Sequence, residues 1–146
     1  MKQFVIKTFI VFIFKSHPFQ GIYFNLLAKN FVVGNLPIDY WGTGNKKTID
    51  SLLQKNEGTF LNISTASYSD LNNIYFSSTK QTKYSKKISF NGTSKESRIN
   101  ADYIFTNYYY DRNPNHSEKY KIPSNFFSYY KLIIDGIIIN ELFKKK

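Results

Sequence analysis

The carboxy-terminal end of the chain places an Asp-Gly pair between two apolar runs rich in Ile, and this pattern restricts the fold more than any other. YYKLII, residues 129–134, precedes Asp135-Gly136, and IIINELF, residues 137–143, follows it. Asp and Gly accept the positive φ angles of a two-residue type I′ turn, whose twist matches that of paired antiparallel strands. The pattern therefore predicts a β-hairpin.

A short amphipathic helix is predicted over residues 45–54, NKKTIDSLLQ. Ile49, Leu52 and Leu53 are spaced i, i+3 and i+4, so they form one apolar stripe that needs a partner surface. Gly58 follows the segment closely enough to end the helix.

The remaining segments alternate between strand and helix patterns. Strands are predicted at residues 59–65, 86–90 and 101–110, a second helix at 67–78, a polar loop or short turn at 93–100 and a longer loop at 111–120. Alternating strands and helices that end in antiparallel strands predict a small α/β domain with a mixed sheet and short flanking helices.

An apolar run near the amino terminus extends from Phe4 to Phe14 and is interrupted only by Lys7 and Thr8. It covers about 11 residues, whereas a helix that spans a membrane needs about 20. The run can be a signal peptide without the small residues of a cleavage site, a buried strand, or the last half of a transmembrane helix.

The net charge of +10 raises the question of an anionic partner. The basic residues are nearly all Lys, and only Arg98 and Arg112 are Arg, the side chain that reads phosphates and bases in bidentate fashion. The charge therefore indicates a Lys-rich solvated surface, and no nucleic-acid partner is expected.

Several kinds of site are disfavoured by the residue types present. The chain has no Cys, and His17 and His116 are far apart, so we expect no metal site and no thiolate chemistry. GTGNKKT lacks the spacing of a phosphate-binding loop. The acidic residues form no spaced pair for acid–base catalysis, and no cofactor is expected.

Four segments together resemble a known group of proteins: HPFQGIYFN at 17–25, DYWGTGNKKTIDSLL at 39–53, ADYIFTNYYY at 101–110 and YYKLIIDGIIINELFKK at 129–145. In this order they are similar to the carboxy-terminal extramembrane domain of GT-C-type membrane glycosyltransferases, the group of protein O-mannosyltransferases and aminoarabinose transferases. The resemblance covers nearly the whole chain from His17 onward.

The resemblance implies a membrane setting for the amino-terminal part. Residues 1–16 would be the end of a transmembrane helix, 17–38 a membrane-proximal segment and 39–146 a soluble α/β domain on the extracytoplasmic side. Proline ends a helix readily, and aromatic rings favour the membrane interface. The expected interface residues are His17, Pro18, Phe19, Tyr23 and Phe24.

Two departures from the relatives stand out. The relatives often begin the helix with a Ser cap and a Glu three residues on, where this chain has Gly44 and Lys47, so the capping box is lost. Such enzymes also carry their catalytic Asp in an extramembrane loop near the amino terminus, which this sequence lacks. The resemblance therefore implies a domain that is not catalytic alone.

Asp39, Tyr40 and Trp41 form a candidate saccharide-binding trio, because rings stack on sugars and a carboxylate accepts hydrogen bonds from their hydroxyls. The alternative is that Trp41, the only Trp of the chain, packs the helix onto the sheet.

Two functions are consistent with this sequence. The first is the soluble domain, or a truncated remnant, of a glycosyltransferase that uses a polyprenyl-phosphate sugar, with membrane lipid, the lipid-linked sugar or a glycan acceptor as partners. The second is a stand-alone, membrane-anchored module that binds anionic lipid or polysaccharide.

Overall fold

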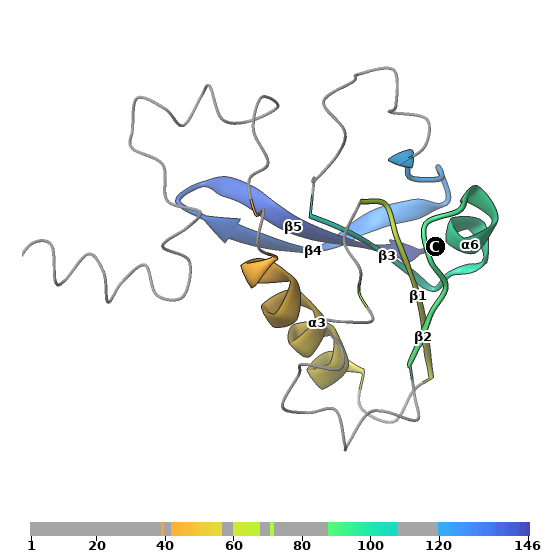
Figure 1. The fold of residues 1–146 in the computed structure, drawn as a ribbon, viewed down its shortest axis with the longest axis horizontal. Coiled ribbons are helices and arrows are strands. Elements are labelled where there is room, and N and C mark those ends of the chain that lie inside the picture. Colours follow the sequence, from red (N-terminus) through yellow and green to blue (C-terminus); the bar gives the residue numbers. More distant parts are fainter. Residues whose placement is uncertain (1–38, 40–41, 57–59, 68–70, 72–87, 108–119) are drawn as a thin grey trace, which may run out of the picture.

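Five strands form one mixed sheet with the order β2-β1-β3-β5-β4 (Figure 1). The computed structural model describes residue 39 and residues 42–56, 60–67, 71, 88–107 and 120–146. The strands are β1 (Leu61–Thr65), β2 (Ile88–Phe90), β3 (Tyr103–Thr106), β4 (Phe126–Ile134) and β5 (Ile137–Lys145). Strand β1 is parallel to β2 and β3, and β5 is antiparallel to both β3 and β4. The predicted small α/β fold with a mixed sheet is confirmed.

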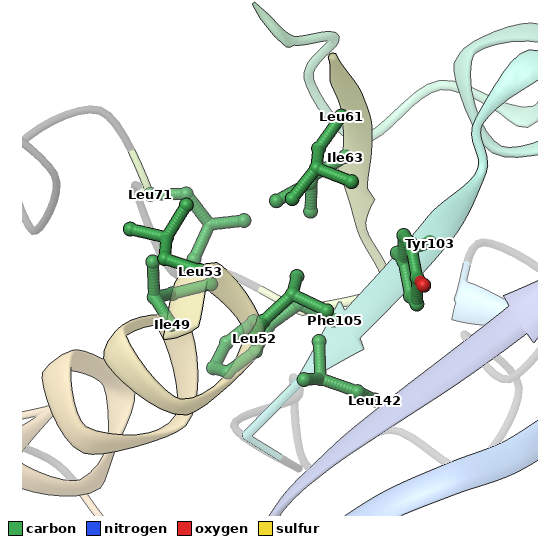
Figure 2. Close-up of a cluster of buried hydrophobic side chains, with 9 residues drawn as sticks. All are labelled: Ile49, Leu52, Leu53, Leu61, Ile63, Leu71, Tyr103, Phe105 and Leu142. Atoms are coloured by element: carbon green, nitrogen blue, oxygen red, sulfur yellow. The ribbon is translucent and has the colours of Figure 1, made fainter. Parts of the chain in front are cut away.

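Helix α3 (Thr43–Lys55) packs its apolar stripe against one face of the sheet. Figure 2 shows the stripe of Ile49, Leu52 and Leu53 turned toward side chains from three strands. The cluster contains Ile49, Leu52, Leu53, Leu61, Ile63, Leu71, Tyr103, Phe105 and Leu142. A helix of this length is marginally stable in water by itself. Packing of the apolar stripe against the sheet stabilises it.

The opposite face of the sheet carries a second cluster. Successive residues of a strand point to opposite faces, so Ile104 lies on the face away from Phe105. It packs with Ala66, Ala101, Tyr120 and Phe126. Both faces of β3 are therefore covered, and all four of its residues are buried.

The carboxy-terminal hairpin is confirmed. Asp135 and Gly136 have φ angles of 50° and 76°, the positive values that a type I′ turn requires. Strand β4 begins at Phe126, three residues before the predicted start, and β5 extends to Lys145.

The prediction of a loop or short turn over residues 93–100 is wrong. Residues Lys95–Asn100 form helix α6, whose N-cap Ser94 accepts a hydrogen bond from the Ser97 N–H at 3.0 Å. Glu96 in the first turn also suits the helix dipole. The polar composition of this segment favours a loop, whereas a Ser cap followed by an acidic residue marks the start of a helix.

Other predicted features lie partly or wholly outside the described residues. These are most of the helix at 67–78, the end of the strand at 101–110, the loop at 111–120, the transmembrane stub at 1–16 and the interface residues His17, Pro18, Phe19, Tyr23 and Phe24. Of the second predicted helix, Ser67 and Leu71 are described: Ser67 lies in a bend and Leu71 is helical. None of the helices that the structure describes has the length and apolar character needed to cross a membrane.

Candidate functional site

Asp39 caps the amino-terminal end of α3. The chain turns after it, with the Gly42 N–H donating to the Asp39 carbonyl oxygen at 3.0 Å and Gly42 at a φ of 65°. The two carboxylate oxygens then accept the N–H groups of Thr43 and Gly44, each at 2.8 Å. These donors belong to the first turn of the helix, which has no partners for them within the helix. Asp39 thus caps the helix from a position upstream of it.

The environment of Asp39 is nearly closed to solvent, since only 1% of the residue is exposed. Burial raises the pKa of its carboxyl group, and the hydrogen bonds from Gly44, Thr43 and Gly42 oppose this shift. A sugar hydroxyl that approached Asp39 would have to compete with two backbone donors already in place. Tyr40 and Trp41, the other members of the predicted saccharide-binding trio, lie outside the described residues.

A polar junction joins the start of α3 to the carboxy-terminal hairpin. The Asn140 side-chain amide donates to Asn45 Oδ1 at 2.6 Å, and both residues are buried. Gly44 sits directly against this pair, because a Cβ atom there would lie 2.1 Å from Asn140 Oδ1. The junction therefore requires glycine at position 44, so that the helix can approach β5 closely, and an amide side chain on β5 that bonds Asn45.

Two buried oxygens next to this junction have no hydrogen-bond partner among the described residues. They are Thr48 Oγ1, one turn further along α3, and Asn140 Oδ1. Buried polar atoms normally find a partner, in protein or in ordered water. The line of Asp39, Asn45, Thr48 and Asn140 beneath α3 is thus a polar strip within an otherwise apolar interface.

A second polar cluster, missed by the sequence reasoning, lies at the carboxyl ends of the parallel strands β1 and β3. Thr65 Oγ1 and Ser67 Oγ lie 3.0 Å apart, and Thr106 Oγ1 donates to the Ala66 carbonyl oxygen at 3.1 Å. Asn107 follows β3 and is 3% exposed. The signal was the change from apolar to hydroxyl and amide residues at the end of each strand.

The topology makes this end of the sheet a favourable binding location. The chain leaves β1 toward β2 on one side and leaves β3 toward β4 and β5 on the other. Ligands of open α/β sheets bind where connections diverge in this way, outside the carboxyl ends of the strands. The hydroxyl and amide side chains at the ends of β1 and β3 therefore lie at a location where α/β sheets commonly bind polar ligands.

Glu141 brings a carboxylate to the same strand end. It is the register partner of Thr106, it is 4% exposed, and its Oε1 lies 3.5 Å from Lys131 Nζ. The carboxylate, hydroxyl and amide groups there are of the types that bond sugar hydroxyls, but like Asp39 they are buried.

The described residues offer no cluster of three or more His, Cys, Asp or Glu side chains that could hold a metal ion. Comparison of the chain with protein-family models, with curated proteins and with solved structures gave no match.

Proposed function

We propose that this chain is the carboxy-terminal extramembrane domain, or a truncated remnant, of a GT-C-type membrane glycosyltransferase that uses a polyprenyl-phosphate sugar donor. The domain does no chemistry alone. It covers the active site of the membrane part and helps to bind the donor or the glycan acceptor on the extracytoplasmic side.

One observation supports this proposal: three of the four segments that carry the resemblance are distant in sequence, and their described residues are in direct contact in the fold. Asp39 of the DYWG segment caps α3, and Asn45 of the same segment bonds Asn140 of the closing hairpin. Strand β3 of the ADY segment pairs along β5 of that hairpin, with Phe105 opposite Leu142. These three segments therefore belong to one folded unit, as the proposed domain requires.

We assign the binding of donor or acceptor to the polar ends of β1 and β3. Thr106, Asn107 and Glu141 carry hydroxyl, amide and carboxylate groups of the types that bond the hydroxyls of a sugar or a glycan acceptor, and in the domain by itself these groups are buried. The carboxylate that activates the acceptor and the groove for the polyprenyl chain would belong to the membrane part.

The first test is the DNA upstream of the codon for Met1. The proposal expects it to encode several apolar segments of about 20 residues each, in frame for an intact enzyme or behind an interrupted frame for a remnant. An upstream region without any such segment contradicts the proposal and favours the stand-alone module.

The second test is made on the protein in its own cells. An antibody against residues 126–146 should detect the chain in membranes after extraction with alkaline carbonate. Protease added from the extracytoplasmic side should destroy the epitope in intact cells. An epitope that is protected there, or that is released entirely into the soluble fraction, contradicts the membrane setting.

A further inference from the structure

Aromatic rings and lysines gather where α3 and β5 end and where β3 and β4 begin. This aromatic–lysine surface consists of Lys55, Tyr103, Phe127, Tyr129, Tyr130 and Lys144. Tyr103 belongs to the periphery of the apolar cluster beneath α3, as Figure 2 shows, so the surface continues that cluster toward solvent. None of its residues belongs to the polar junction at Asn140 or to the polar strand ends at Asn107.

A β-bulge explains why two tyrosines meet on this face. Ser128 pairs with Phe143 and Tyr130 pairs with Leu142, so Tyr129 is an extra residue in β4. In a regular strand Tyr129 and Tyr130 would point to opposite faces. The bulge lets both rings pack, half-buried, against the cluster beneath α3.

The two lysines are held over these rings. Lys55 Nζ lies 5.8 Å from the Tyr129 centroid and 5.3 Å from the Tyr130 centroid. Lys144 Nζ lies 5.5 Å from the Tyr129 centroid and 5.8 Å from that of Tyr103. Two ammonium groups thus share one ring, and that ring meets the Tyr103 ring edge-on at 5.6 Å. Cation–π contacts fix the positions of both charges.

Neither charge is neutralised by an acidic side chain in the part of the chain that the structure describes. Among the described residues an ion pair joins Lys131 to Glu141, whereas Lys55 and Lys144 lie over aromatic rings. Both ammonium groups lie at the Tyr129 ring, so an anion that approached this ring would be attracted by two positive charges. The surface is therefore complementary to negative charge.

Phe127 adds an apolar element beside these charges. It is the register partner of Lys144 and is 43% exposed. Exposed Phe, half-buried Tyr and Lys stems with their ammonium groups extended form the composition that favours a membrane interface. A soluble anion would need the lysines and would gain nothing from Phe127.

We propose that the aromatic–lysine surface docks on a bilayer that contains anionic lipid, with Lys55 and Lys144 at the phosphates and the Phe127 ring among the headgroups. The inference depends on this surface alone and holds whether or not the domain belongs to a glycosyltransferase. It orients the domain, because the end of α3 and the beginning of β4 face the membrane.

The test uses the full chain and a fluorescent label, because the chain contains no Cys and a single introduced Cys is labelled uniquely. Asn125→Cys places the label next to the surface, and Ile133→Cys places it on an exposed residue nearer the hairpin turn. Each labelled chain is mixed with phosphatidylcholine vesicles, with or without phosphatidylglycerol, that carry a lipid-attached quencher. We expect strong quenching at position 125 on the anionic vesicles and weak quenching at position 133.

Charge variants decide whether these two lysines are responsible. Each lysine near an anionic membrane surface raises the binding constant by about fivefold. The double substitution Lys55→Gln with Lys144→Gln should therefore lower the ratio of docked to undocked protein by roughly 25-fold. Lys46→Gln with Lys47→Gln removes the same charge from the other end of α3 and should change it little. Lys55→Arg with Lys144→Arg keeps the charge and should keep docking, and Phe127→Ser should weaken it.

Three results would overturn the proposal. The first is equal quenching at positions 125 and 133, because the domain would then have no fixed orientation. The second is an equal effect of the two Gln pairs, which would reduce the attraction to net charge. The third is a fluorescence change with inorganic phosphate or dextran sulfate as large as that with vesicles, which would assign the surface to a soluble anion or a polysaccharide. Thermal unfolding of each variant verifies that it is folded.

Discussion

Asn45 and Asn140 are 95 positions apart in the sequence, and their side chains share a buried hydrogen bond of 2.6 Å. The bond joins the first turn of α3 to the second strand of the hairpin. Gly44 lies against it so closely that no side chain fits, which fixes the height of the helix above β5. The orientation of α3, and with it the direction of Lys55 at its far end, depends on this contact.

Gly44→Ala should destabilise the domain although alanine favours a helix. Helix propensity alone predicts a gain of about 1 kcal/mol. The new Cβ would lie 2.1 Å from Asn140 Oδ1 and 3.0 Å from carbons of Ile139 and Leu132, so something must shift. Overpacking of this kind costs about 1–3 kcal/mol, measured by urea unfolding.

The double variant with Asn140→Ala separates the clash from other effects. Removing the amide costs stability alone, since the bond to Asn45 is lost, yet it also removes the nearest atom that the new methyl group at position 44 would meet. We expect the two losses to sum to more than the loss in the double variant. Strict additivity would show that the glycine is not required by Asn140.

Asp39→Asn should remove a pH dependence from the stability of the fold. Burial raises the pKa of Asp39 in the folded chain above the ordinary value of 3.8, so the folded state binds the proton more tightly than the unfolded state. Between the two pKa values the contribution of Asp39 to stability therefore falls as the pH rises, and above the folded pKa it is constant.

The measurement is the difference in unfolding free energy between wild type and Asp39→Asn from pH 3 upward, since other groups cancel in this difference. It should decrease with rising pH and then level off. A difference that increases with pH would mean that the bonds from Thr43 and Gly44 outweigh burial.

Local patterns were sufficient to predict the main elements. The stripe of Ile49, Leu52 and Leu53 predicted α3, and Asp135-Gly136 predicted the hairpin, because in both cases the signal lies within a few residues of the structure it forms. Helix α6 was missed, although Ser94 and Glu96 marked its start.

The contacts that build the candidate sites could not be predicted in the same way. The bulge at Tyr129 depends on the register between β4 and β5, and the bond between Asn45 and Asn140 depends on how α3 lies over the sheet. Residue spacing in the sequence predicts neither the bulge nor this bond. Asp39 was identified as a candidate sugar ligand from its neighbours Tyr40 and Trp41, while its capping of a helix four residues on follows only from the turn at Gly42.

Gly136→Val should destabilise the hairpin. Gly136 has a φ of 76°, a region that β-branched side chains avoid, so the substitution should cost roughly 1–3 kcal/mol. Asp135→Asn is the matched control, because Asn tolerates the φ of 50° at that position. The measurement is the melting temperature of both variants. An unchanged melting temperature for Gly136→Val contradicts a requirement for glycine at this position.

A chain that begins at Phe19 distinguishes two interpretations of the amino-terminal run. If residues 4–14 are the end of a membrane helix, the shortened chain should be soluble and folded, and the full chain should partition into detergent. If they are a core strand, their removal should expose an edge of the sheet and cause aggregation. Circular dichroism and gel filtration of both chains give opposite results in the two cases.

The chain should show no glycosyltransferase activity by itself. Transfer from a lipid-linked donor needs a carboxylate held beside the acceptor and a groove for the polyprenyl chain. The two buried carboxylates of the described residues are already engaged, Asp39 with the backbone of α3 and Glu141 with Lys131.

The assay incubates the full chain in detergent with polyprenyl-phosphate sugars and candidate acceptors, and mass spectrometry detects product. Weak saccharide binding, followed by the fluorescence of Trp41, is compatible with this expectation. Turnover without any membrane partner contradicts it, and loss of that turnover in Glu141→Gln but not in Asp102→Asn would place the active site at the ends of β1 and β3.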